Sequence, residues 1–484
     1  MQEKKSFFNS DTVKKLNIAC LLLVICCVLF YPAKKNIWYD ETVSVLCAKG
    51  LYYTDGNALT ALPLNTSVAL EQQNTLSEAY TCTIIDNGNS LLYNEGLHFF
   101  TMLSGNSFSS YLLYSKLCAI ATLLAFFALC SLFMEGSIFT SLALLLLTSD
   151  TIFWGMAQEV RAYEMGMLMV TLATTFFYKY MYKGDRPYHL FLTGMFAVAA
   201  ILSHYLSVYI ILVLLAFILF VKRTSLFSAK NILAIAIPVT IVGIYFYSAA
   251  KGFGTMQNQN NALKAKQSEE LFSVTQVVLR SLKFGALNFK TVFPAFNGSA
   301  GIVIVSFLMV IALYFGALKF SKTPKEKRNL HLLFILGVSS SIFLAALSIK
   351  SHHYTALYSR YYTFCVPFAT LFVAYALKVL YDGVNKNLAT GLVAIIVIPC
   401  LALLAMGAIK RKTHVKYNHL EVAGKISNEK INKITVPDWT DAFLLQSFLP
   451  SGYKIEYKID SASTNFVLFH ENKTDTIKVI RINS

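Results

Sequence analysis

Four short stretches of the chain place carboxylates and cations beside aromatic residues. A carboxylate can take the proton of an attacking hydroxyl group, and an arginine can hold phosphate oxygens through two hydrogen bonds. The combination suits general base catalysis next to an anionic leaving group. The stretches are WYDE with Asp40 and Glu41, QEVRAY with Glu159 and Arg161, SHY with His204 and Tyr205, and SRYY with Arg360.

The elements that must position these residues are membrane spans. Of the 484 residues, 56% are hydrophobic and 14% are charged, and the mean hydropathy is +0.54. Soluble domains carry about 25% charged residues, so the composition excludes a soluble enzyme, a secreted disulfide scaffold and a disordered chain. Apolar stretches near the ~20 residues that cross a hydrocarbon core recur, and we expect about eleven spans. They are placed at 16–33, 111–134, 137–155, 162–182, 188–206, 207–221, 231–249, 300–319, 330–348, 362–380 and 388–409.

Lysine and arginine residues set the expected orientation. The net charge of +16 comes from 42 Lys and Arg against 26 Asp and Glu. In membrane proteins such an excess gathers in cytoplasmic loops, and no separate basic domain indicates nucleic-acid binding. With the N-terminus inside, all four polar stretches lie outside, and the first span is retained because no small-residue cleavage site follows it. The short basic inner segments are then 1–15, 178–188, 221–231, 319–329 and 378–387.

Three expected outer regions are long enough to fold. The first loop, 34–110, exceeds what a connection needs. The second, 250–299, contains an amphipathic interfacial helix capped by Ser268 and ended by Gly285, and we expect it to be a mobile lid carrying Lys283. The tail, 410–484, reads as strand KITV, helix WTDAFLLQSFL and strands YKIEYKI, NFVLFHE and TIKVIRI. The expected fold is an all-α polytopic membrane domain, 1–409, N-inside and C-outside, followed by a small outer α/β domain.

Two of the nine cysteines, Cys47 and Cys82, fall in the first outer loop. The other seven lie in apolar spans, where cysteine usually acts as a small hydrophobic residue. No Cys/His spacing indicates zinc. If the outside is oxidising, a disulfide between Cys47 and Cys82 is an open possibility.

Each polar stretch also has a structural interpretation. Arg161 and Arg360 could extend to lipid head groups from helix ends, and His204 could be an interfacial histidine. The tyrosines beside them, Tyr163 and Tyr361, fit an interfacial aromatic belt better than a site. The adjacent carboxylates of WYDE are harder to explain in this way, because nothing in a membrane-proximal loop requires two of them beside aromatic residues.

The four stretches resemble motifs of the C-type glycosyltransferases that use lipid-linked sugars, in the branch of protein O-mannosyltransferases, aminoarabinose transferases and their bacterial relatives. WYDE resembles the acidic first-loop motif, AQEVRAYEMGMLMVTLATTFF the QEARxYAL stretch, AAILSHYLSVYIILV the THY segment, and SRYYTFCVPFATLFVAYAL the RYxxPxxP segment. The resemblance covers about residues 15–410. Two family features, a Pro-rich HPPLYY-like stretch and an Arg-Leu-Pro, are replaced by YNEGLHFF and YLLYSKLC. Glu95 and His98 are therefore acceptor-side candidates without an assigned role.

The resemblance implies an inverting enzyme that moves a sugar from a polyprenyl phosphate to an acceptor hydroxyl or amine at the outer membrane face. The acceptor is a glycan, lipid or protein. A donor of this kind carries no nucleotide, so no Walker or Rossmann glycine motif is needed, and none occurs in the sequence. No cofactor is required, although a divalent metal is left open. The expected location is the bacterial cytoplasmic membrane.

Residue roles follow from the same chemistry. We expect Asp40 to be the general base, with Glu41 orienting it or contacting the acceptor and Glu159 as a further catalytic candidate. Arg161 is the leading phosphate ligand, and its guanidinium is expected within about 10 Å of the Asp40 carboxylate. The second choices for the phosphate are His204 with Tyr205, Arg360, and Lys283 of the lid.

Three alternatives remain. A transporter or flippase of lipid-linked saccharides would show broken helices and mid-membrane charges, often in two related halves. The span interiors hold almost no acids, and no internal repeat stands out. An O-antigen-ligase-like enzyme would carry its chemistry in a late outer loop, whereas the acidic pair lies in the first. A non-catalytic membrane scaffold is the third.

Overall fold

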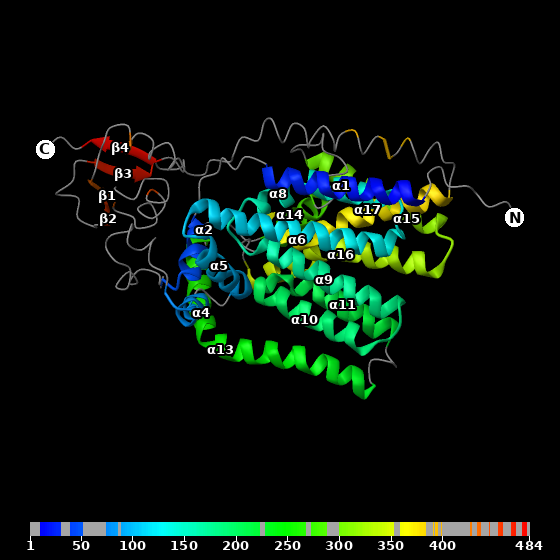
Figure 1. The fold of residues 1–484 in the computed structure, drawn as a ribbon, viewed down its shortest axis with the longest axis horizontal. Coiled ribbons are helices and arrows are strands. Elements are labelled where there is room, and N and C mark those ends of the chain that lie inside the picture. Colours follow the sequence, from blue (N-terminus) through cyan, green and yellow to red (C-terminus); the bar gives the residue numbers. More distant parts are fainter. Residues whose placement is uncertain are drawn as a thin grey trace.

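In the computed structural model of the chain, most of the long helices lie side by side and form a bundle, and a group of short helices lies at one end of it (Figure 1). The structure describes residues 10–30, 39–51, 74–85, 89–222, 228–267, 273–287, 300–352 and 359–383, together with four short strands and a few isolated residues beyond them. The helices are α1 (Ser10–Phe30), α2 (Tyr39–Ala48), α4 (Leu76–Ile85), α5 (Leu91–Ser104), α6 (Phe108–Met134), α7 (Phe139–Ser149), α8 (Thr151–Ala157), α9 (Tyr163–Tyr182), α10 (Pro187–Ser203), η2 (Tyr205–Ser207), α11 (Val208–Val221), α13 (Ala229–Gln267), α14 (Val274–Leu287), α15 (Ala300–Phe320), α16 (Pro324–Ser351), η4 (Ser359–Cys365) and α17 (Val366–Gly383).

Membrane-spanning helices make up much of the bundle, as the sequence predicts. Among the described residues, five helices are long and apolar enough to cross a membrane: α1, α6, the first part of α13, α16, and α17 with most of η4. The bent pair α7 and α8 is a sixth if it counts as one span, and α10, η2–α11 and most of α15 are apolar but shorter. The chain is therefore a polytopic helical protein, while the count of about eleven stays a prediction. The last expected span, 388–409, lies almost entirely outside the described residues.

The span expected at 137–155 is two helices, α7 and α8, bent by 65°. The break is at Asp150, whose side chain accepts hydrogen bonds from the backbone N–H of Ile152 at 2.7 Å and of Phe153 at 3.2 Å. A short acidic side chain competes in this way for the donors at a helix start, so it caps α8. The bend sets the direction in which the chain enters the turn with Glu159 and Arg161.

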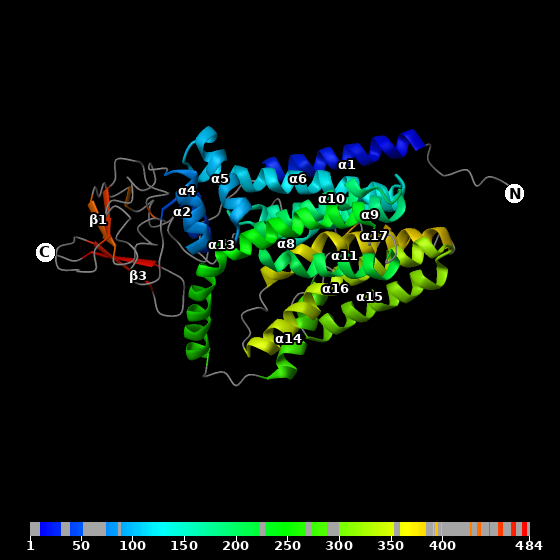
Figure 2. The ribbon, with the colours of Figure 1, turned by 90° about the horizontal axis from the view of Figure 1, so that it is seen from below.

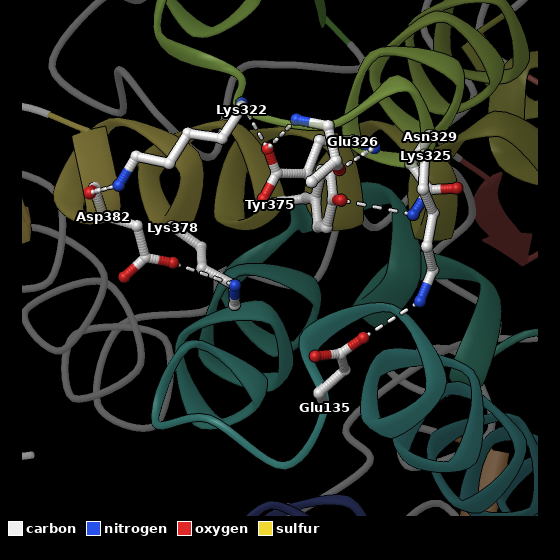
Figure 3. A network of polar contacts seen from close by, with 9 residues as sticks. Glu135, Lys322, Lys325, Glu326, Asn329, Tyr375, Lys378 and Asp382 are labelled. Carbon is white, nitrogen blue, oxygen red and sulfur yellow. Dashed lines mark hydrogen bonds and ion pairs between the residues drawn. The ribbon is translucent and has the colours of Figure 1, made fainter. Parts of the chain in front are cut away.

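One end of the bundle is bound together by lysines and carboxylates (Figure 3). Lys325 at the start of α16 lies 2.9 Å from Glu135 after α6, and the Lys322 ammonium donates to the Asp382 carbonyl at the end of α17. Lys378 lies 3.0 Å from the Asp382 carboxylate. Exposed pairs of this kind contribute only ~0–1 kcal/mol each, so their value is to identify which helix ends lie together. We call this the basic end; it joins two of the basic segments expected on the inner side of the membrane.

In the region expected to be a lid, the helix bounds differ from the prediction, while the lid role itself stays a prediction. Residues 250–267 are helical and continue α13. The expected cap, Ser268, lies outside the described residues, and α14 extends past Gly285 to Leu287. Gly285 does not end the helix; a side chain there would collide with Ser341 of α16, so the glycine permits close packing of the two helices. Figure 2 shows α14 beside α15 and α16.

The four strands expected in the tail are present. β1 (Lys433–Val436) pairs in parallel with β2 (Lys454–Tyr457), and β3 (Phe466–His470) pairs antiparallel with β4 (Ile477–Arg481). The alternation of YKIEYKI is typical of such a strand. The expected helix at 439–449 lies outside the described residues apart from Leu445. The division into a membrane domain and a small tail domain stays a prediction.

Candidate active site

The polar stretches singled out in the sequence meet at the end of the bundle opposite the basic end, which we call the site end. Asp40 and Glu41 occupy the first turn of α2, not an irregular loop. Carboxylates are favoured there because the unpaired N–H groups give a helix start a partial positive charge. Arg161 lies between α8 and α9, His204 between α10 and η2, and Arg360 in η4.

Asp40 is paired with Arg360, a residue 320 positions later in the chain. The Arg360 Nη1 atom lies 2.6 Å from Asp40 Oδ2, with the two side chains 25% and 23% exposed, respectively. The guanidinium also lies over the Tyr361 ring, 5.2 Å from its centre. Both members of the pair can therefore be reached by a ligand from solution.

Arg161 binds the backbone of the same aspartate. Its Nη1 atom donates to the Asp40 carbonyl oxygen at 2.9 Å and to Ser44 Oγ at 3.0 Å. Because the carbonyl and carboxyl groups of one residue are only a few ångströms apart, the guanidinium satisfies the expected bound of about 10 Å. Ser44 was missed in the sequence. It stands one helical turn after Asp40, and this i, i+4 spacing is the signal that could have found it.

Glu41 points away from solvent and is fully buried. Its Oε1 accepts a hydrogen bond from the backbone N–H of Val160 at 2.8 Å. This contact fits the orienting role better than a contact with an acceptor, because it joins the start of α2 to the turn that carries Arg161. The start of α2 and the turn before α9 are thus connected twice. The Glu41 side chain of α2 contacts the backbone of the turn, and the Arg161 side chain of the turn contacts the backbone of α2.

We expect Glu41→Ala to destabilise the protein because it leaves the buried Val160 N–H without an acceptor. Such a loss costs ~1–3 kcal/mol, and thermal unfolding in detergent would detect it. Glu135→Ala is the matched control, since that carboxylate pairs with Lys325 but is 69% exposed. Equal melting temperatures for Glu41→Ala and the control would contradict the anchoring role.

His204 lies within a group of aromatic rings. It is buried, and its ring centre is 5.1 Å from that of Tyr163 and 5.2 Å from that of Phe364. Its Nδ1 accepts from the backbone N–H of Leu206 at 3.3 Å, so the hydrogen of the neutral ring is on Nε2. Tyr205, half-buried, follows it. The interpretation of Tyr163 as a belt residue is wrong, because this side chain is only 1% exposed.

Close packing positions the segment that bears Arg360. A side chain at Gly166 of α9 would overlap the Phe364 ring, so the glycine lets η4 approach α9. Tyr209 of α11 donates its hydroxyl hydrogen to the Tyr361 carbonyl oxygen at 3.0 Å. The segment that carries Arg360 is therefore held in place by contacts with α9 and α11.

The remaining candidates lie in the turn before α9, on α14 and on α5. Glu159 is half-buried in the turn two residues before Arg161. Lys283 is on the exposed face of α14, and α14 borders η4. His98 of α5 is buried, with Nδ1 2.7 Å from the Ala48 carbonyl oxygen, so it attaches α5 to the end of α2.

Glu95, also on α5, differs from these residues because both of its carboxylate oxygens are buried without a hydrogen-bond partner among the described residues. Burial raises the pKa of Glu95 to about 7. The unfolded value is about 4.3. Between these values the folded chain binds more protons than the unfolded one, so its stability falls as pH rises through this window and is level above it.

Glu95→Gln should remove this dependence. Relative to wild type, we expect the variant to gain about 1 kcal/mol between about pH 5 and about pH 8, because the residue as a whole is only half-buried and solvent screens part of the effect. Melting temperatures at both pH values measure it. Glu78→Gln is the control, because hydrogen bonds from Thr75 lower the pKa of Glu78 and its effect lies at more acidic pH. A constant difference between Glu95→Gln and wild type at both pH values would contradict the argument.

A divalent metal fits the described side chains poorly. Within the described part of the chain, no three His, Cys, Asp or Glu residues come together as possible ligands. At the site, Asp40 is paired with Arg360 and the Glu41 carboxylate accepts from Val160.

Comparison with known proteins gives structural similarities only. No family model and no curated protein match the sequence. The chain is similar to the oligosaccharyltransferase AglB from Archaeoglobus fulgidus, solved with an inhibitory peptide and a dolichol-phosphate, at 11% identity and a TM-score of 0.48, covering 93% of this chain and 65% of that one. A structure of an oligosaccharyltransferase from Archaeoglobus fulgidus tethered to an acceptor peptide has 12% identity and a TM-score of 0.45, and the match covers 93% of this chain and 64% of that one.

A third similarity is to ArnT from Cupriavidus metallidurans in the apo state. The identity is 11% and the TM-score 0.39, and the match covers 92% of this chain and 85% of that one. The chain spans about 65% of the length of the archaeal oligosaccharyltransferase.

Proposed function

We propose that the chain is an integral-membrane inverting glycosyltransferase that moves a sugar from a polyprenyl phosphate to an acceptor hydroxyl or amine. The observation that carries the proposal is the arrangement around Asp40. Its carboxylate is partly exposed at a helix start, and two arginines from distant segments bind the same residue. A base and two cations are thus placed together, as the reaction requires.

The proposed reaction needs one base and a place for a departing phosphate. The acceptor oxygen attacks the anomeric carbon and loses its proton to Asp40, while the bond from that carbon to the phosphate oxygen breaks. Arg360 and Arg161 are positioned to neutralise the charge that grows on the polyprenyl phosphate. No second carboxylate is needed as a nucleophile, so the anomeric configuration inverts.

Donor binding offers Arg360 a second anionic partner. The Asp40–Arg360 pair is about a quarter exposed, so a phosphate can approach the guanidinium and compete for it. When Arg360 turns to the phosphate, Asp40 Oδ2 becomes available to the acceptor hydroxyl. Arg161 keeps the backbone of Asp40 in place during this exchange, since it binds the carbonyl oxygen and not the carboxylate.

The same proposal includes an orientation and a lipid entrance. The basic end belongs on the cytoplasmic side, because lysines and arginines concentrate there, and the site then faces outward from a bacterial cytoplasmic membrane. The lipid would enter beside α14, whose exposed face is apolar at Val278, Leu279 and Leu282 and also carries Lys283. A helix of this kind lies in the membrane interface.

The test is to incubate the purified protein with radiolabelled polyprenyl-phosphate sugars and membrane extract and to identify the labelled product. We expect label to pass to a glycan, lipid or protein with inverted anomeric configuration. A parallel reaction with a chelator examines metal dependence. If no label is transferred but the protein moves lipid-linked sugars across vesicle membranes, the flippase alternative replaces the proposal.

A further inference from the structure

The helix that carries Asp40 in its first turn, α2, is joined at its other end to the start of α4 and to the residues just before it. The Gly50 carbonyl accepts from Asn74 Nδ2 at 3.0 Å, and the Lys49 carbonyl accepts from the Asn74 N–H at 3.0 Å. Gly50 has φ +70°, and a side chain there would lie 2.9 Å from Glu78 Cβ and 3.0 Å from Ala79 N. Only glycine therefore allows this turn and this close approach of α4.

Two cysteines face each other at this junction. Cys47 Sγ and Cys82 Sγ are 2.9 Å apart, and the Cys82 thiol also lies 3.1 Å from the Leu51 carbonyl oxygen. Both side chains are buried, 0% and 1% exposed, against Val43. Both are free thiols in the structure, and their positions in α2 and α4 leave the two sulfur atoms only a short approach before they reach the ~2 Å of a disulfide bond.

We propose that Cys47 and Cys82 form a disulfide that locks α2 to α4 and so keeps Asp40 in register with its two arginines. The inference rests on the proposed function in one respect, because the outward orientation puts this pair in an oxidising compartment. Cys47 stands seven residues, or about two helical turns, after Asp40. A covalent bond at this end therefore limits rotation and translation of the short helix that presents the base.

The oxidation needs an electron acceptor, and a protein dithiol oxidant in its disulfide form supplies it. One thiolate attacks the oxidant's disulfide, and the second attacks the mixed disulfide. The products are the Cys47–Cys82 bond and the reduced dithiol of the oxidant, which receives two electrons and two protons. Because both sulfurs are buried in the folded chain, this exchange takes place before α4 closes on α2.

The direct test is to count thiols in the full-length protein purified without reductant. After denaturation, a PEG-maleimide should label seven of the nine cysteines, and all nine after reduction. Cys118→Ser is the matched control, because Cys118 is buried in α6 and its loss leaves the two-thiol difference intact. Cys47→Ser should abolish the difference. Nine labels on wild type without reductant would overturn the proposal.

A second measurement concerns the consequence for the fold. Reductant should lower the melting temperature of wild type by several degrees, because the bond restricts the unfolded loop between the two cysteines. It should leave the Cys47→Ser/Cys82→Ser variant unchanged. The transfer assay separates this inference from the proposed function: seven labels without sugar transfer would refute only the enzyme, and transfer with nine labels would refute only the disulfide.

Discussion

Asp40→Asn should reduce sugar transfer by about 10²–10⁴-fold, the usual contribution of a positioned base. The amide cannot accept the acceptor proton, but it keeps the size and position of the carboxyl group. Donor binding should remain, because the arginines are still present and Arg161 binds the unchanged carbonyl oxygen of residue 40. Radiolabel transfer measures the rate, and binding of a polyprenyl phosphate measures the donor affinity.

Asp185→Asn is the matched control for this variant. Asp185 also pairs with a cation, 2.6 Å from Lys222, but it lies in the segment between α9 and α10 and away from the site end. The Asp40–Arg360 pair is partly exposed, so its loss should lower the free energy of unfolding by no more than ~1 kcal/mol. Thermal unfolding of both variants measures this change. Wild-type turnover in Asp40→Asn would remove Asp40 from the role of base.

The meeting of the four polar stretches was predictable from the sequence, whereas their contacts were not. Counting lysines and arginines assigned WYDE, QEVRAY, SHY and SRYY to one face, and the structure brings Asp40, Arg161, His204 and Arg360 to one end of the bundle. The order and orientation of the membrane spans do not determine the direction in which each side chain points, and the pairing of side chains depends on that direction. Arg161, expected at the phosphate, binds the backbone of Asp40, and Arg360 binds the carboxylate.

Some missed features had a local signal in the sequence. Asp150 interrupts an apolar run with a residue that favours helix starts, and this could have predicted the bend between α7 and α8. Ser44 follows Asp40 at helical spacing, but the segment was interpreted as a loop. Other features had none: two adjacent carboxylates look alike in sequence, and only tertiary packing buries Glu41 and leaves Asp40 partly exposed.

Arg360→Ala should lower transfer by about 10²–10³-fold, similar to the removal of one preorganised donor from a developing anion. It should also weaken binding of a polyprenyl phosphate, since the guanidinium is expected to bind the donor phosphate. Arg360→Lys retains the charge but not the planar pair of donors, so it should recover only part of both losses. Arg328→Ala is the matched control: this arginine also stacks on a ring, that of Tyr182 at 5.8 Å, but in the basic segment that begins α16.

The variant Arg161→Ala tests whether Arg161 acts by binding the donor or by positioning the base, Asp40. Arg161 holds the start of α2 through the Asp40 carbonyl and Ser44, so its loss should lower turnover even at saturating donor. Ser44→Ala removes one of these contacts and should produce a smaller fall of the same kind, with donor affinity unchanged. For Arg360→Ala, weaker binding of the donor should account for more of the fall in transfer than slower turnover at saturating donor does. If Arg360→Ala binds donor and turns over as wild type does, then Arg360 only extends to lipid head groups, and the cation that meets the phosphate is Arg161.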